Sequence, residues 1–178
     1  EPQNDPSGGD MSGRVAILGL GERGQRWAEA CLRAGWDVAC FDPDDRTGLS
    51  LPKADFRREP TISATVRRAD WIVCCLPERL ELIQMVIQRV QAEAADTAVL
   101  AVASSTHDVE ELQSCAIRPG QVVRVQVADS GGVALDVSSR NDEAFRASFT
   151  KALADLAVVF GLEPGRQTGA ASDVSKEA

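Results

Sequence analysis

The sequence contains no tyrosine and a single histidine, His107, and aromatic residues make up only 4% of its 178 positions. Without tyrosine the chain cannot use a tyrosine general acid, which excludes the Tyr–Lys pair of short-chain dehydrogenases. One histidine excludes every site that needs two imidazoles, such as an HExxH zinc site or a zinc finger. Chemistry that needs a histidine base therefore has only His107 to use.

Basic charge is also scarce, with 19 Lys and Arg against 27 Asp and Glu and a net charge of −8. Nucleic-acid binding needs a basic face, so the charge disfavours that class of partner. No apolar stretch approaches the ~18 residues of a membrane span. Residues 1–12 are mostly polar and lack the parts of a signal peptide. We therefore expect a cytoplasmic protein with no nucleic-acid or membrane partner.

The five cysteines are odd in number and form no CxxC motif. Cys40, Cys74 and Cys75 stand in apolar runs that are typical of buried strands. Reduced, buried thiols in a cytosolic protein explain this pattern, and we expect no metal site.

Apolar runs alternate with helical periods along the chain. Strands are predicted at 14–19, 37–41, 71–76, 98–103, 122–127 and 133–137. Helices are predicted around 27–32, 80–94, 108–115 and 145–160. Prolines and a glycine predict a loop over 43–60. Strands that are apolar throughout are buried on both faces, and the helices between them supply the crossovers. The predicted fold class is α/β, with a doubly wound, mostly parallel, Rossmann-like sheet.

Three segments follow from this pattern. Residues 13–164 are predicted to form one dinucleotide-binding domain. Residues 1–12 are expected to be a disordered tail or a non-native remnant, and residues 165–178 a second disordered tail.

A GxGxxG motif formed by Gly19, Gly21 and Gly24 ends the first predicted strand and opens the first predicted helix. In that context the first glycine permits a tight turn, the second lets a pyrophosphate approach the backbone, and the third lets the helix pack against the strand. The phosphates would meet the free N–H groups and the positive end of the helix dipole.

Asp42 follows the second predicted strand and lies 18 residues beyond Gly24. An acid ~20 residues after the motif holds an adenosine ribose and repels a 2′-phosphate, which favours NAD over NADP. The alternative is a glycine-rich turn with a strand-capping aspartate. For Arg23 two roles stay open, contact with the pyrophosphate or exposure to solvent.

The chain resembles the NAD-binding domain of the L-3-hydroxyacyl-CoA dehydrogenase family, and within it the L-carnitine dehydrogenases. Residues 15–24, 34–43 and 69–82 carry the resemblance, and the stretch PERLEL at 77–82 is the most specific part. Weaker support comes from 104–106, 118–119 and 161–164.

The resemblance implies oxidation of a 3-hydroxyl group to a ketone by hydride transfer to NAD. It implies a cofactor site made of Gly19, Leu20, Gly21, Glu22, Arg23, Gly24, Asp42, Pro77 and Glu78. Glu78 is expected beside the nicotinamide half, or else as a first-turn helix acid favoured by the dipole. Ser105 matches a serine near the substrate hydroxyl, although a helix cap or strand-end hydroxyl explains it equally well.

Several departures from the family concern its catalytic residues. Gln126 stands where the family has its catalytic histidine, and an amide cannot accept a proton near neutral pH. The glutamate that orients that histidine falls near Asp136 or Ser138. Ile83 replaces the family's usual lysine, and the family's C-terminal helical domain has no counterpart in this sequence. Because general acid–base catalysis contributes about 10²–10⁴-fold, the departures predict NAD binding with weak turnover or none.

His107 is a further candidate base, with Asp129 as its partner, or else a partly exposed turn histidine. Three functions stay open. The first is a 3-hydroxyacyl-CoA or carnitine dehydrogenase-like oxidoreductase, whose substrate is a small 3-hydroxy acid or acyl-CoA. Its substrate domain would then come from a longer gene product, a partner chain or self-association. The second is a 3-hydroxyisobutyrate or 6-phosphogluconate-type fragment, which 19–21 and 130–133 also resemble. The third is a non-catalytic nucleotide-binding or interaction protein that kept the fold.

Overall fold

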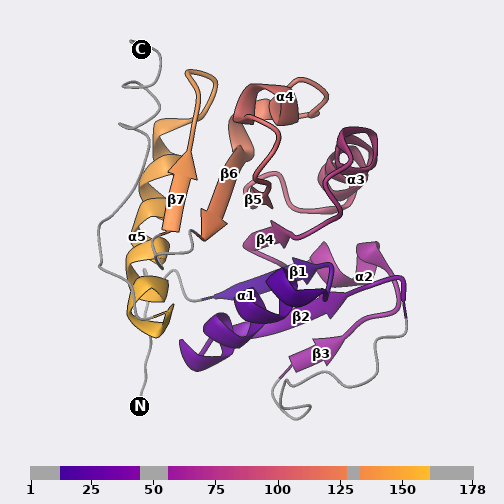
Figure 1. The fold of residues 1–178 in the computed structure, drawn as a ribbon, viewed down its shortest axis with the longest axis vertical. Helices are drawn as coiled ribbons and strands as arrows, with labels where there is room; N and C mark the ends of the chain where they lie inside the picture. Colours follow the sequence, from indigo (N-terminus) through magenta and orange to yellow (C-terminus); the bar gives the residue numbers. More distant parts are fainter. Residues whose placement is uncertain (1–12, 45–55, 128–132, 161–178) are drawn as a thin grey trace.

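A computed structural model describes residues 13–44, 56–127 and 133–160, which form one seven-stranded sheet with helices on both faces (Figure 1). The strands are β1 (Arg14–Leu18), β2 (Asp37–Phe41), β3 (Phe56–Arg58), β4 (Trp71–Cys74), β5 (Val99–Ala103), β6 (Val122–Val127) and β7 (Val133–Asp136). The helices are α1 (Glu22–Arg33), α2 (Ile62–Val66), α3 (Leu80–Glu93), α4 (Val109–Gln113) and α5 (Glu143–Phe160), with a 3₁₀ turn at Pro119–Gln121.

The strand order is β3-β2-β1-β4-β5-β6-β7. Strands β1 to β6 are paired in parallel, and β7 is antiparallel to β6. The predicted doubly wound, mostly parallel α/β fold is therefore confirmed.

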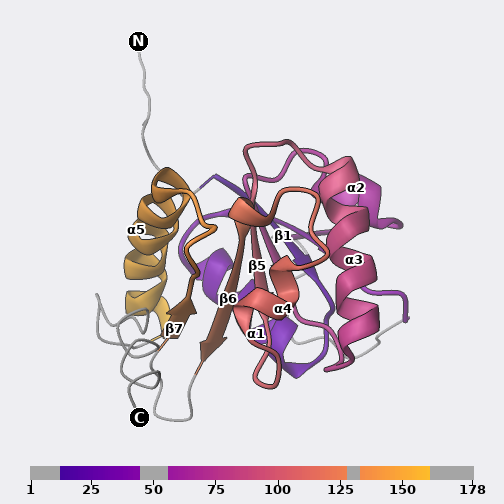
Figure 2. The ribbon, with the colours of Figure 1, turned by 90° about the horizontal axis from the view of Figure 1, so that it is seen from above.

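The sheet separates two apolar layers because successive side chains of a strand point to opposite faces. In β1, Val15 and Ile17 join the layer that contains buried residues of α1 and α5. Ala16 and Leu18 join the layer that contains buried residues of α2, α3 and α4. Figure 2 shows α5 on one side of the sheet and α2 and α3 on the other.

The face of α1 that meets the sheet carries Trp27 and Cys31, which are both buried. The helix ends in a Schellman arrangement, in which Trp36 N–H donates to the carbonyl of Cys31 at 3.0 Å. Gly35 has a φ of +83° at this end, a conformation that favours glycine. This arrangement ends α1 and fixes the point from which β2 starts.

The predicted loop over 43–60 is wrong in its last part. Phe56–Arg58 forms β3, which pairs in parallel with β2 from Val38 to Cys40. A three-residue edge strand has too little local pattern to be distinguished from a loop, and its partner strand decides its conformation. Three predicted strands end one or two residues early, β1 at Leu18, β4 at Cys74 and β7 at Asp136. The predicted tails at 1–12 and 165–178 lie outside the described residues.

The strand order reverses direction between β1 and β4. From β1 the chain goes to β2 on one side, and it later returns to β4 on the other side. In open α/β sheets, ligands bind in the crevice at the carboxyl ends of the strands at such a switch point. The fold thus directs attention to the residues that follow β1 and β4.

Candidate functional site

The turn from β1 into α1 packs so closely against its neighbours that two of its glycines have no room for a side chain. Gly19 has a φ of +96°, and a Cβ there would lie 2.2 Å from the carbonyl oxygen of Cys75. A Cβ on Gly24 would lie 1.7 Å from the carbonyl oxygen of Gly19. These two glycines therefore hold β1, α1 and the end of β4 together.

Gly21 differs from both because a Cβ there would meet nothing within 4 Å. It is the N-cap of α1, in an extended conformation and without a side-chain capping bond. The first N–H groups of a helix have no acceptor within the helix, and the positive end of its dipole favours an anion. The amino end of α1 is thus open to an anionic ligand.

Asp42, directly after β2, is buried beside this turn and is 8% exposed. Its Oδ2 accepts a hydrogen bond from the Leu20 N–H at 2.6 Å, and its Oδ1 accepts one from the Asp44 N–H at 2.8 Å. These two bonds hold both oxygens of its carboxylate against the turn. Asp42 therefore stabilises the glycine turn while it lines the adjoining cavity.

Among the cavities at this edge of the sheet, two are lined by Glu22 and Arg23 of α1. The larger one, of about 890 Å³, is lined by Leu18, Gly19, Gly21, Glu22, Arg23, Gly24, Phe41, Asp42, Pro43, Asp44, Ile62, Cys75, Leu76, Pro77, Arg79, Leu82 and Val86. The smaller one, of about 460 Å³, is lined by Glu22, Arg23, Arg26, Trp27, Glu78, Ala103, Ser104, Ser105, Val125 and Gln126. Leu20 is buried and its N–H donates to Asp42, whereas the other predicted cofactor residues line one or both of these cavities.

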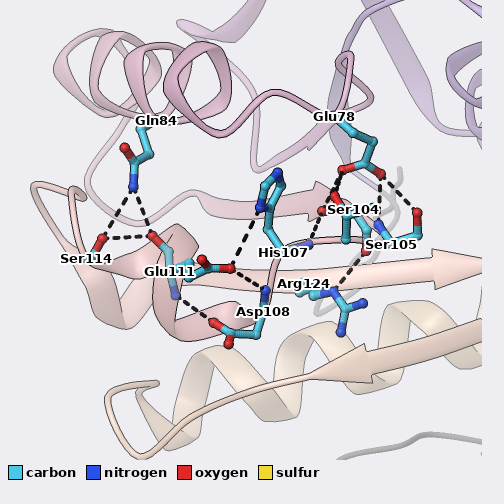
Figure 3. Close-up of polar contacts among 10 residues, drawn as sticks. Glu78, Gln84, Ser104, Ser105, His107, Asp108, Glu111, Ser114 and Arg124 are labelled. Atoms are coloured by element: carbon cyan, nitrogen blue, oxygen red, sulfur yellow. Dashed lines mark hydrogen bonds and ion pairs between the residues drawn. The ribbon is translucent and has the colours of Figure 1, made fainter.

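Glu78 lies at the centre of the polar contacts in the smaller cavity (Figure 3). Its Oε1 accepts bonds from the hydroxyls of Ser104 at 2.8 Å and Thr106 at 3.0 Å. Its Oε2 accepts the Ser105 N–H at 2.8 Å and the Ser105 hydroxyl at 3.1 Å. Helix α3 starts at Leu80 with Arg79 as its N-cap, so Glu78 precedes the helix and is not a first-turn acid.

These donors set the charge of Glu78. Partial burial raises its pKa, but the hydrogen bonds from Ser105, Ser104 and Thr106 outweigh that effect and hold the pKa below its usual value of 4.5. Glu78 is thus a carboxylate at neutral pH. A carboxylate with a lowered pKa is a poor proton acceptor, because a general base works best with a pKa near the working pH.

Arg23 reaches from α1 across the ends of β4 and β5. Its Nη2 donates to the Leu76 carbonyl at 2.7 Å, and its Nη1 donates to the Ala103 carbonyl at 2.8 Å. Nη1 also lies 3.5 Å from Oε2 of Glu78. The guanidinium group is therefore fixed by protein acceptors, an arrangement that neither of its two predicted roles included.

Only two of the four predicted catalytic candidates are brought together by the described part of the chain. Ser105 and Gln126 line the smaller cavity. His107 does not line it, and Asp129 lies outside the described residues. The His107 N–H donates to the Ser104 hydroxyl at 3.1 Å, and its Nδ1 is 3.7 Å from Oε1 of Glu111 (Figure 3). Its Nε2 is buried without a hydrogen-bond partner among the described residues.

The turn that holds these residues is supported from two sides. Asp108 caps α4 in a capping box with Glu111, as the sequence predicts for a helix start there. Arg124 of β6 donates to the Ser104 carbonyl at 2.8 Å and is paired with Asp136 of β7. Asp136, a predicted neighbour of the catalytic position, thus holds an arginine of the sheet.

The cysteines are free thiols, as predicted. Cys75 lines the larger cavity, and its burial raises its pKa to about 12, an effect that the charge of Arg23 opposes. It is therefore a protonated thiol at neutral pH, without nucleophilic character. In the described parts of the chain no group of three or more His, Cys, Asp and Glu residues is able to hold a metal ion. No described helix is long and apolar enough to cross a membrane.

A family model described as the NAD binding domain of 6-phosphogluconate dehydrogenase matches residues 14–140. The chain belongs to this family. The matched range includes the glycine turn, and the predicted cofactor class, NAD, is confirmed.

Two curated relatives extend the likeness. The L-carnitine dehydrogenase/betainyl-CoA thioesterase of Ruegeria pomeroyi is 34% identical over 61% of this chain and 26% of its own length. The L-carnitine dehydrogenase of Streptomyces griseus is 25% identical over 62% of this chain and 39% of its own length. The predicted resemblance to carnitine dehydrogenases is confirmed, and the chain spans well under half the length of these relatives.

Solved structures share the fold. The (S)-3-hydroxybutyryl-CoA dehydrogenase from Ralstonia eutropha has a TM-score of 0.72 at 17% identity, covering 85% of this chain and 62% of that one. The dehydrogenase part of a multifunctional enzyme from C. elegans has a TM-score of 0.74 at 16% identity, covering 88% and 41%. The domain fold is thus that of 3-hydroxyacyl-CoA dehydrogenases.

The residues present fit one half of a dinucleotide well. The open space over Gly21, the uncapped amino end of α1 and the carboxylate of Asp42 suit an adenosine pyrophosphate. The other half is crossed by Arg23 and lined by charged and hydroxyl side chains. Sequence reasoning missed Ser104, Thr106 and the bridging role of Arg23, because only the packing of β4 beside β5 brings them to Glu78.

Proposed function

We propose that the chain is the NAD-binding domain of a 3-hydroxy-acid oxidoreductase and that it binds NAD through its adenosine pyrophosphate half. The observation that carries the proposal is the open N-cap at Gly21 above the larger cavity. The N–H groups after Gly21 would bind the phosphates, and Asp42 would accept the hydroxyls of the adenosine ribose. A carboxylate there repels a 2′-phosphate, so we propose a preference for NAD over NADP.

The proposed residue set keeps the sequence prediction. Gly19, Leu20, Gly21 and Gly24 form the turn, and Pro77 and Glu78 follow the neighbouring strand β4. Glu22, the first residue of α1, would flank the phosphates. Arg23 lies between the two halves of the site. When bound, NAD supplies the hydride acceptor, and the protein holds it at the switch point of the sheet.

As this chain alone, we propose weak catalysis or none. Oxidation of a hydroxyl group requires a group that takes its proton. Of the residues lining the smaller cavity, Gln126 cannot accept one, and Glu78 is held as a weakly basic carboxylate. Ser105 donates its hydroxyl to Glu78. A partner chain, self-association or a further domain would then supply the substrate site for a 3-hydroxy acid or acyl-CoA.

The second candidate is a non-catalytic nucleotide-binding protein, and one observation favours it. The chain's single histidine lies outside the smaller cavity and contacts Glu111 instead. The family model also keeps a 6-phosphogluconate-type dehydrogenase fragment open. Free thiols at the five cysteines support the cytoplasm as the place of action.

A calorimetric titration with NAD tests the proposal. We expect binding in the micromolar range, and absence of binding at millimolar NAD would refute a live cofactor site. A coupled assay with 3-hydroxybutyryl-CoA and with carnitine then separates the two candidates. A rate above background with either substrate supports the oxidoreductase, whereas NAD binding without a rate supports the nucleotide-binding protein.

A further inference from the structure

Resting on the proposed function, we propose that Arg23 is a gate between the two halves of the nucleotide crevice. Nucleotides that end at the diphosphate, such as ADP, bind to the chain without moving it. An intact dinucleotide must displace it. Arg23 would thus determine which adenosine diphosphate nucleotides the domain prefers.

The first support is the way in which Arg23 spans the crevice. Leu76 lies just beyond β4, and Ala103 is the last residue of β5. One guanidinium group donates to both carbonyls, at 2.7 and 2.8 Å. Its planar fork of donors lets it hold two acceptors at once with little rotational freedom. The side chain therefore closes the gap between the ends of two neighbouring strands.

The second support is the position of Arg23 relative to the two cavities. Both cavities share Glu22 and Arg23 among their lining residues. Gly21 and Asp42 belong to the larger cavity only, whereas Glu78 and its hydroxyl donors Ser104 and Ser105 belong to the smaller one only. A ligand seated on the glycine turn that continues into the smaller cavity must pass Arg23.

The third support is chemical. The carbonyls of Leu76 and Ala103 are acceptors at the carboxyl edge of the sheet, where a bound ligand's amide would find its partners. The nicotinamide group carries such an amide, with two N–H donors. Arg23 thus satisfies, within the protein, acceptors that the second half of a dinucleotide would otherwise use. Binding of that half exchanges one set of hydrogen bonds for another.

The test compares ADP with NAD in calorimetric titrations of the whole chain and of R23M. Methionine keeps an unbranched, helix-compatible side chain but has no donors. For wild type we expect ADP to bind at least as tightly as NAD. In R23M we expect NAD to bind about tenfold more tightly, because the two hydrogen bonds of Arg23 no longer have to be exchanged for those of the ligand. ADP affinity should change by less than about twofold.

Two further variants distinguish the gating role of Arg23 from a general effect of positive charge in the smaller cavity. R26M removes a positive charge three residues along α1 from the lining of the same smaller cavity, and in the described part of the chain Arg26 has no hydrogen bond or ion pair. Because R26M leaves Arg23 and its two carbonyl acceptors in place, we expect it not to tighten NAD binding and to change ADP affinity by less than about twofold. R23K keeps the charge but loses the planar fork, so we expect NAD to tighten less than in R23M.

The outcomes discriminate clearly. Weaker NAD binding in R23M, or equal changes for ADP and NAD, would overturn the gate and make Arg23 a phosphate ligand or a bystander. If R23M does not fold, the ratio of NAD to ADP affinity in R23K decides in its place. Failure of wild type to bind ADP would refute the proposed function itself, and so the two ideas fail in different experiments.

Discussion

The two cavities beside α1 differ in the groups that line them. The larger one takes its shape from the glycine turn and from apolar side chains such as Leu18, Ile62 and Leu82. The smaller one takes its character from charged and polar side chains, among them Arg26 and Gln126. The larger cavity is therefore the backbone-built half of the site, which the fold itself forms. The smaller cavity is the side-chain-built half, which individual side chains form.

This difference explains how the chain would keep the capacity to bind NAD and lose the capacity for catalysis. A backbone-built half remains as long as β1, α1 and β4 pack as they do, because the N–H groups belong to the main chain. A half built from side chains changes its chemistry with a single substitution. Gln126, where the resemblance implies a histidine, is such a change, and the strand β6 that carries it is intact.

Replacement of Gly24 by alanine should have the largest effect on stability, because it disrupts the packing of the backbone-built half directly. The added Cβ would lie 1.7 Å from the carbonyl oxygen of Gly19, so β1 and α1 must separate. We expect a loss of at least about 3 kcal/mol in the free energy of unfolding, or no folded protein. Urea titration measures it. Gly21→Ala is the matched control in the same turn, and it should cost less than about 1 kcal/mol. Equal losses in the two variants would contradict the close packing.

Replacement of Gly21 by aspartate should separate binding from stability. Asp is a preferred N-cap residue, and its charge suits the helix dipole, so we expect a gain of about 0.5 kcal/mol in the free energy of unfolding. The same carboxylate would take the N–H groups proposed for the pyrophosphate and would repel it. NAD affinity should fall by at least about a hundredfold. Paired thermal melts and titrations give both numbers, and unchanged NAD binding would mean that the phosphates bind elsewhere.

Sequence reasoning predicted the backbone-built half well because its signals are local. The glycine spacing, the apolar run before it and the helical period after it all lie within 14–35. The prediction of Asp42 needed only one further strand, at the expected distance from the glycine motif. These elements carry their own pattern, and the parallel sheet then leaves few ways to arrange them.

The side-chain-built half could be predicted only in part, because its contacts are long-range. Glu78 meets Ser104 over 26 positions of sequence, and Arg23 meets Ala103 over 80. Neither spacing has a local signature. β3 shows the same limit in the fold, since three residues acquire their strand conformation from pairing with β2.

Replacement of Glu78 by glutamine should show, through the pH dependence of stability, that Glu78 in the smaller cavity is ionised. The folded-state pKa of Glu78 lies below the unfolded value near 4.5, so its ionised form stabilises the fold above that pH. This contribution is lost as the pH falls through the lowered folded pKa. At neutral pH we expect E78Q to lose about 1–2 kcal/mol of unfolding free energy, since its amide can no longer accept every donor as a charged group. Urea titrations at neutral and acidic pH should show the difference from wild type shrinking well below pH 4.5. A difference independent of pH would contradict an ionised Glu78.

Replacement of His107 by alanine should have the smallest effect. It tests whether His107 belongs to the site that the smaller cavity forms. The imidazole lies outside both cavities, and the bond from this turn to Ser104 comes from the main-chain N–H, which alanine keeps. NAD affinity should therefore change by less than about twofold. Unfolding free energy should fall by about 1 kcal/mol, because the side chain is only 17% exposed. His107→Gln, which keeps a polar side chain, should recover part of that stability. If wild type shows a dehydrogenase rate and H107A abolishes it with NAD affinity intact, His107 is the base, and the catalytic half extends beyond the cavity that Gln126 lines.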